Sequence, residues 1–302
     1  MHIPDGFLTN RVAISLDMLS SASILYAARR IKLDASGRMV PIMGVLAAFV
    51  FAAQMFNFPI LGGTSGHLMG GALLSILLGP MAGSLTLATV IIAQALFLQD
   101  GGLIALGTNI FNIGAVASFA GYAVFRLIGG AASEGRRRVL AGFLAGWISL
   151  LLSSACCALE LALSGAIPLR VGLPAMVGYN AIVGVVEGGL TAGVLTFLSK
   201  VRPDLLRVDS QPRFGLADGA GAIVFVAIPI AILALAGSSS LPDPLEKLLA
   251  AAPLTSVQRA DLLKLSSTAR YLDYLIRTSF FVLLIGIVYL VSHFARDRRS
   301  KS

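Results

Sequence analysis

Two histidines and the first residue of the chain have the chemistry of a metal site. His2 can close fused chelate rings around one ion with its imidazole Nδ1, its own backbone nitrogen and the free α-amino group of Met1. A bulky second residue disfavours methionine excision, so we expect Met1 to be retained. A fourth nitrogen from His67 would complete a square-planar set, the geometry typical of Ni²⁺ or Cu²⁺. On residue types alone, a solvated terminal histidine and a helix-capping histidine are the commoner interpretation.

Four further polar side chains lie around the predicted outer end of two apolar runs. They are Gln94, Asp100, Asn109 and Asn112, and they could orient the imidazoles or line an access path for the ion. Hydrogen bonds between helices explain the amides equally well. The glycine-rich segment GGTSGHLMGG around His67 can bend and let backbones approach closely, so it could draw the N-terminus into a helix bundle.

Motifs of enzyme chemistry are absent from the sequence. There is no Gly-x-x-x-x-Gly-Lys-Ser/Thr phosphate loop, so we expect any ATP hydrolysis to occur on separate subunits. There is no His-Glu-x-x-His zinc-protease motif and nothing that resembles a nucleophile elbow. We therefore expect the chain not to be an enzyme and to use no organic cofactor.

The composition indicates what must position the candidate ligands. Of the 302 residues, 57% are hydrophobic and 13% are charged, and the mean hydropathy is +0.87. Long apolar runs without strand-like alternation predict spanning helices, because backbone groups in lipid must be satisfied internally. The fold class is an all-α polytopic membrane protein with nine spans. The predicted spans are Val12–Ala28, Met39–Phe58, His67–Leu78, Met81–Leu98, Leu103–Gly129, Val139–Leu163, Pro174–Leu198, Leu216–Ala236 and Leu275–Phe294. The third is short enough that it would cross only by tilting, or lie inside the bundle.

Charge in the loops predicts the orientation. With the N-terminus outside, the cytoplasmic segments 29–38, 126–138, 200–213 and 296–302 carry 16 of the 23 Lys and Arg residues, as the positive-inside rule requires. The C-terminus is then cytoplasmic, and His2 and His67 both lie on the outer side. The same rule explains the net charge of +8 without any nucleic-acid partner.

The longest charged connection divides the chain. We expect a seven-span metal-binding core in 1–200, a cytoplasmic linker in 201–215, and a two-span companion module in 216–302 with an outer loop at 237–274. Neither Lys nor Arg precedes Arg11, so we expect no cleavable signal peptide and a retained N-terminus.

Three segments resemble one family of transporters. MHIPDGF at the start, HLMGGALLSILLGP at 67–80 and QDGGLIALGTNIFNIG at 99–114 are similar to the CbiM/NikM family, the substrate-specificity (S) components of group I energy-coupling factor nickel and cobalt transporters. The resemblance covers roughly residues 1–200. It implies that Met1, His2 and His67 hold the metal, through the terminal amine, the second amide and imidazole, and the later imidazole.

The companion module carries a resemblance of its own. LPDPLE at 241–246 resembles the Pro-Asp-Gly-Leu-Glu signature of the small CbiN/NikN partner subunit, here fused. Pro244 stands where that signature has glycine. Since proline cannot adopt the positive φ that glycine allows, we expect a different turn here.

These observations predict a subunit of an ATP-driven importer in the cytoplasmic membrane of a prokaryote. It would bind Ni²⁺ or Co²⁺ outside and work with a transmembrane coupling protein, cytoplasmic ATP-binding cassette ATPases and lipid. A deprotonated amide argues against Mg²⁺ and Ca²⁺, and the Irving–Williams order favours nickel over cobalt. Affinity should fall below about pH 6 as histidine protonates. The alternative is a proton-coupled secondary metal transporter whose relay uses Asp17, Glu160 or Glu187.

Overall fold

The computed structural model describes residues 1–31, 39–60, 64–130, 135–201 and 242–251. The elements in chain order are α1 (Asn10–Arg30), α2 (Met39–Gln54), β1 (Phe58–Ile60), β2 (Thr64–Gly66), α3 (Gly71–Leu78), α4 (Pro80–Ala93), the π-helix η1 (Gln94–Leu98), α5 (Leu106–Asn109), the π-helix η2 (Ile110–Val116), α6 (Ala117–Leu127), α7 (Arg136–Leu163), α8 (Leu169–Val201) and α10 (Pro244–Ala250).

Long apolar runs form the main helices. Within the described residues, four helical segments are long and apolar enough to cross a membrane, namely Pro80–Leu98, Leu106–Leu127, Arg136–Leu163 and Leu169–Val201. They coincide with four predicted spans, which confirms the helical class. Two of them contain π-helical turns, a feature that recurs at functional sites. The predicted spans Leu216–Ala236 and Leu275–Phe294 lie outside the described residues.

The predicted span His67–Leu78 is wrong in its bounds, because only Gly71–Leu78 is helical. A helix of eight residues rises about 12 Å, whereas the hydrocarbon core of a bilayer is about 30 Å thick. Residues 71–75 of α3 are all buried. This helix therefore lies inside the bundle, and His67 precedes it on non-helical backbone.

The predicted span Met39–Phe58 also ends early, and a small hairpin follows it. α2 ends at Gln54, and β1 then pairs antiparallel with β2, with Phe58 opposite Gly66. Pro59 cannot continue a helix and disfavours helical backbone in the residue before it, which explains the early end. The hairpin was not predicted. It sets the direction in which the chain approaches His67.

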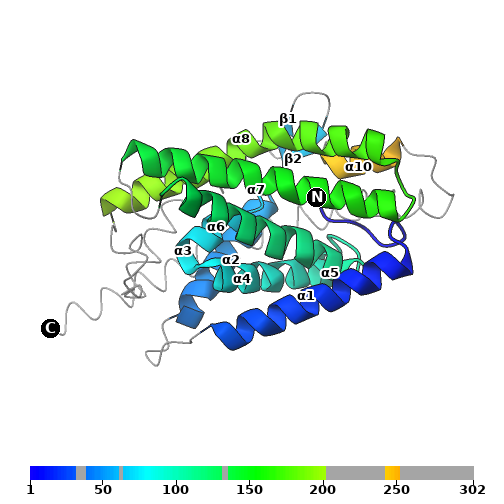
Figure 1. Cartoon of the computed structure of the whole chain (residues 1–302), viewed down its shortest axis with the longest axis horizontal. Coiled ribbons are helices and arrows are strands. Elements are labelled where there is room, and N and C mark those ends of the chain that lie inside the picture. The colour runs from blue at the N-terminus through cyan, green and yellow to red at the C-terminus, as the bar shows by residue number, and fades with distance from the viewer. Residues whose placement is uncertain (32–38, 61–63, 131–134, 202–241, 252–302) are drawn as a thin grey trace.

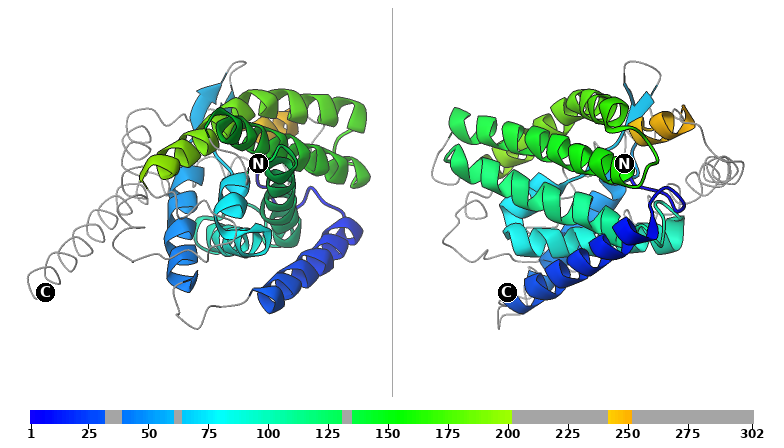
Figure 2. Two further views of the ribbon diagram at one scale, coloured as in Figure 1. Left: turned by 60° about the vertical axis from the view of Figure 1, so that its left-hand side comes forward. Right: turned by 45° about the vertical axis from the view of Figure 1, so that its right-hand side comes forward.

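The helices form a bundle around α3. α7 packs along α8, and α3 contacts α4, α6 and α7. Figure 1 shows α7 and α8 together on one side of the bundle and α1 along the opposite side, and the two views of Figure 2 agree with this arrangement. Many large apolar side chains on the outside of α1, α7 and α8 are exposed, as expected for surfaces that face lipid.

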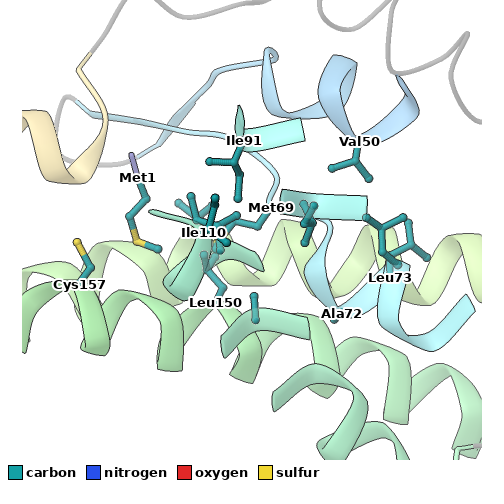
Figure 3. Packing of buried hydrophobic residues seen from close by; sticks show 14 of the residues in the cluster. Met1, Val50, Met69, Ala72, Leu73, Ile91, Ile110, Leu150 and Cys157 are labelled. Carbon is teal, nitrogen blue, oxygen red and sulfur yellow. The ribbon is translucent and has the colours of Figure 1, made fainter. Parts of the chain in front are cut away.

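The first residues of the chain lie in the core. Met1, Ile3 and Phe7 belong to the main buried apolar cluster, and His2 is only 7% exposed. Figure 3 shows the Met1 side chain within this cluster, with Cys157 of α7 among its labelled members. The α-amino group of the chain is therefore held inside the protein.

The described part of the predicted outer loop is α10 with the two residues before it and the one after it. Asp243 caps the helix by accepting from the backbone N–H of Glu246, whose carboxylate accepts from the backbone N–H of Asp243. Pro244 occupies the first helical turn, where its fixed φ is favourable. The proline therefore fits a helix start and not a glycine turn.

Candidate metal centre

The N-terminal amine meets His67 directly. The nitrogen of Met1 lies 2.6 Å from Nε2 of His67, and Nδ1 of His67 lies 3.1 Å from the backbone oxygen of Leu68. If the protonated amine donates to Nε2, then Nδ1 carries the ring proton and donates to Leu68. Metal-binding histidines have the same pattern, with one nitrogen free to bind and the other donating to a fixed acceptor.

The spacing of the two nitrogens suits a shared ion. Two nitrogens bound side by side at about 2.0–2.1 Å from one metal lie roughly 2.9 Å apart. The observed 2.6 Å between Met1 and His67 is close to that value, so an ion could replace the shared proton with little rearrangement.

His2 lies beside this pair. Its ring is stacked on that of His67, with centroids 5.7 Å apart and planes 9° from parallel. Its Nδ1, the atom that the chelate uses, lies 3.2 Å from the half-exposed carboxylate of Asp100. A metal bound to Nδ1 would replace this contact. Nε2 of His2 is buried and has no hydrogen-bond partner among the described residues.

Asp243 completes the surroundings of the amine, and the sequence did not predict this role. Its Oδ2 accepts from the Met1 amine at 2.8 Å. The residue before it, Pro242, is held by its backbone oxygen, which accepts from the backbone N–H of Ser65 at 2.8 Å. Burial disfavours charge on both partners, yet their mutual attraction outweighs it. The pair raises the pKa of the amine above 8.0 and lowers the pKa of Asp243 below 3.8. In the sequence, the signature LPDPLE was the available indication that this segment has a function.

The same charges act on His67. Burial is the largest effect, and the electrostatic influence of the Met1 amine and of the neighbouring His2 adds to it, so the pKa of His67 lies well below its ordinary value of 6.5. The imidazole is therefore neutral at neutral pH, the state in which it can bind a metal.

The loop at 99–105 holds the N-terminal segment in place. The side chain of Asn109 both donates to and accepts from the backbone of Ile3, at 3.1 and 2.8 Å, and the backbone N–H of Gly102 donates to the same residue at 2.9 Å. The carboxylate of Asp5 accepts from three consecutive backbone N–H groups, those of residues 103–105. Gly101 packs so closely that a Cβ there would meet His2 at 3.1 Å. Chelation by residues 1 and 2 would therefore start from a fixed backbone.

The structure does not bring all the predicted polar residues to the imidazoles. Asp100 contacts His2, and Asn109 acts through Ile3 as described. Asn112 instead donates to Glu160 at 2.6 Å. The side-chain amide of Gln94 is buried without a hydrogen-bond partner in the described ranges, and only its backbone oxygen accepts from the N–H of Asp100.

The carboxylates of the alternative proton relay also have partners. Asp17 accepts from the backbone N–H of Gly107 at 2.9 Å, and Glu160 accepts from Asn112. Glu187 accepts from the backbone N–H groups of Met69 and Gly70, both at 2.8 Å. Each of these groups joins two parts of the fold.

The donor set is built mainly of nitrogen. Nowhere in the described residues do three or more His, Cys, Asp or Glu side chains form a cluster that could hold a metal. The terminal amine, the two neighbouring imidazoles and the amide of His2 would offer four nitrogens to one ion. Such a set suits a late transition metal and not a hard cation.

Comparison with known proteins gives consistent results. A family model described as CbiM, cobalt uptake substrate-specific transmembrane region, matches residues 2–205. The chain is 42% identical over 214 residues to a putative fused nickel transport protein NikMN of Archaeoglobus fulgidus, which covers 70% of each chain. It is 34% identical over 255 residues to the fused nickel transport protein NikMN of Rhodobacter capsulatus, which covers 78% of this chain and 73% of that one. A crystal structure of a transition metal transporter matches with a TM-score of 0.61 at 32% identity, over 68% of this chain and 96% of that one.

Proposed function

The chain belongs to the CbiM family of cobalt uptake substrate-specific transmembrane regions, and from this membership we propose that it captures Ni²⁺ at the outer face of the membrane. It is a multi-pass membrane component of nickel/cobalt uptake, a transport protein and not an enzyme. In our proposal it is the S component of an energy-coupling factor importer in the cytoplasmic membrane of a prokaryote. A transmembrane coupling protein and cytoplasmic ATPases would supply the energy.

The proposal depends on one observation above all, the contact of the Met1 amine with Nε2 of His67 beside the ring of His2. Buried amines and imidazoles are seldom packed together, because each loses its hydration and only one of the two can carry a positive charge there. A metal ion that binds the lone pairs of the Met1 amine and of Nε2 of His67 would explain this arrangement. Met1, His2 and His67 are the ligands that we propose.

Nickel is the metal that the donor set favours. A strong-field planar set of four nitrogens that includes a deprotonated amide suits the d⁸ ion, and the Irving–Williams order places Ni²⁺ above Co²⁺. Co²⁺ is the alternative substrate. Copper would bind more tightly still, so its exclusion would depend on availability in the cell.

Binding at the outer face is supported by two independent features. The loop charges predict an outer N-terminus and an outer loop at 237–274. Asp243 belongs to that loop and contacts the Met1 amine at 2.8 Å, so both segments meet at one end of the molecule.

Uptake of labelled nickel by cells that carry the chain with its coupling protein and ATPases tests the proposal. We expect accumulation to stop when the phosphate-loop lysines of the ATPases are replaced, and to persist when a protonophore is added at constant ATP. The reverse pattern, with uptake independent of the ATPases and abolished by the protonophore, would support the proton-coupled transporter and overturn our proposal.

Nickel affinity is expected to rise steadily from about pH 5.5 to about pH 8, by about tenfold per pH unit for each proton displaced. The raised pKa of the Met1 amine keeps it protonated over this range, so the ion must displace that proton. The lowered pKa of His67 leaves that imidazole neutral over this range, so His67 itself adds no proton for the ion to displace. Isothermal titration in buffers of different ionisation enthalpy measures both effects. A binding constant that is flat from pH 5 to pH 8 would contradict an amine–imidazole site.

A further inference from the structure

Four residues, His67 to Gly70, connect β2 to α3 outside any regular element. Leu68 and Met69 are buried, and Gly70 adopts a positive φ of 77° that its lack of a side chain permits. Buried backbone without helix or sheet needs hydrogen-bond partners from elsewhere. In this segment the partners come from α2 and α8.

Glu187 of α8 holds the segment from one side. Its side chain is 1% exposed, its Oε2 accepts from the N–H of Met69, and its Oε1 accepts from the N–H of Gly70, both at 2.8 Å. Gln54, the last residue of α2, donates from Nε2 to the backbone oxygen of Met69 at 2.7 Å. Two helices that are distant in sequence therefore fix the backbone just after His67.

One peptide unit connects the ring of His67 to the clamp that Glu187 and Gln54 form on this backbone. The N–H of Met69 and the carbonyl of Leu68 belong to the same planar peptide group. Glu187 accepts from that N–H, and the carbonyl oxygen lies 3.1 Å from Nδ1 of His67. The carboxylate therefore sets the tilt of the peptide plane, and the plane sets the rotation of the ring.

We propose that Glu187 is a positioning residue for metal binding, which acts through the Leu68–Met69 peptide to hold Nε2 of His67 toward the Met1 amine. Carboxylates that orient metal-binding histidines usually contact the ring directly, whereas here a peptide group lies between them. The carboxylate also polarises that peptide, so its carbonyl becomes a better acceptor for the ring N–H. The inference rests on the proposed function, because it assigns a purpose to the His67 geometry.

Glu187→Gln in the full-length protein is the main test. The amide keeps one acceptor oxygen but turns a donor toward one of the two N–H groups. We expect nickel affinity, measured by isothermal titration, to fall roughly 10- to 100-fold, the usual loss when a group that orients a metal ligand is changed. Glu187→Asp keeps the charge but withdraws the carboxylate by about 1.5 Å. It should show a similar loss, and it carries the test if the glutamine variant does not fold.

Thr191→Val is the matched control. Thr191 lies one turn further along α8, is 1% exposed, and its hydroxyl donates within the helix to the backbone oxygen of Glu187. We expect this variant to bind nickel within about twofold of the original protein, since no metal ligand depends on that hydroxyl. Equal losses in the Thr191 and Glu187 variants would mean general damage to α8 and would overturn the inference.

Nitrogen NMR of histidine-labelled, metal-free protein gives a second readout. The original chain should show His67 with its proton on Nδ1, and the Glu187 variants should lose that preference. Unchanged His67 signals and unchanged affinity in both variants would overturn the inference. If the original protein binds neither Ni²⁺ nor Co²⁺, the proposed function fails, while the His67 signals still test the clamp alone.

Discussion

Replacement of His67 by alanine is expected to abolish tight nickel binding. The variant loses the imidazole nitrogen that lies 2.6 Å from the N-terminal amine. The neighbouring imidazole, that of His2, is already a proposed ligand and cannot replace it. Changes to groups that only orient a ligand cost about 10- to 100-fold in affinity, so loss of a ligand should exceed the upper end of that range.

Titration and optical spectroscopy on the purified protein measure this effect. The original chain loaded with nickel should be yellow and diamagnetic, with a d–d band in the blue, and the band should be absent from the variant. His2→Ala should behave alike. His293→Ala is the matched control, because that histidine is predicted at the cytoplasmic end of the last span. Near-original affinity in His67→Ala would contradict the proposed ligand set, and a paramagnetic octahedral nickel complex would contradict planar binding.

Two leucines inserted between Met1 and His2 are expected to be as damaging as loss of either histidine, and a bulky second residue still protects Met1 from excision. The insertion keeps both side chains but breaks the fused chelate rings, which form only when the amine and the imidazole lie on adjacent residues or one residue apart. The backbone cannot compensate by sliding, because Ile3 is hydrogen-bonded to Asn109 and Asp5 holds the loop at 103–105. The amine would move by up to about 7 Å, the length of two extended residues.

The control for this experiment is the same pair of leucines inserted between Thr9 and Asn10. Both residues are exposed and immediately precede or begin α1, where insertions are usually tolerated. Titration of the two purified insertion variants with nickel separates the effects. If the insertion at position 2 leaves affinity unchanged, His2 binds as an ordinary imidazole or not at all.

Local properties of the sequence predicted most of the membrane core. The length and apolarity of a run decide whether it forms a long helix, so Pro80–Leu98 and Arg136–Leu163 could be predicted from the sequence alone. α3 and the hairpin could not, because their structure depends on which helices surround them. A short apolar run gives the same pattern in a span and in a buried core helix.

The site was predictable to the extent that it depends on adjacent residues. The chelating ability of Met1 and His2 follows from their order in the chain. Asn109 and Asn112 resemble each other in the sequence, yet Asn112 lies about 4.5 Å further along the helix, beyond the turn that meets Ile3. The contact of Asp243 with the amine was not predicted, because it joins residues 242 positions apart and the LPDPLE signature does not indicate what it contacts.

The ion pair between Met1 and Asp243 also affects the order in which the site forms during synthesis. The ribosome makes Met1 before Asp243, and the helices from α1 to α8 are translated in between. A nascent chain therefore holds its terminal amine and both proposed ligand histidines before the carboxylate partner exists. The charge around the amine changes during synthesis, and the site reaches its final state only after Asp243 has been translated.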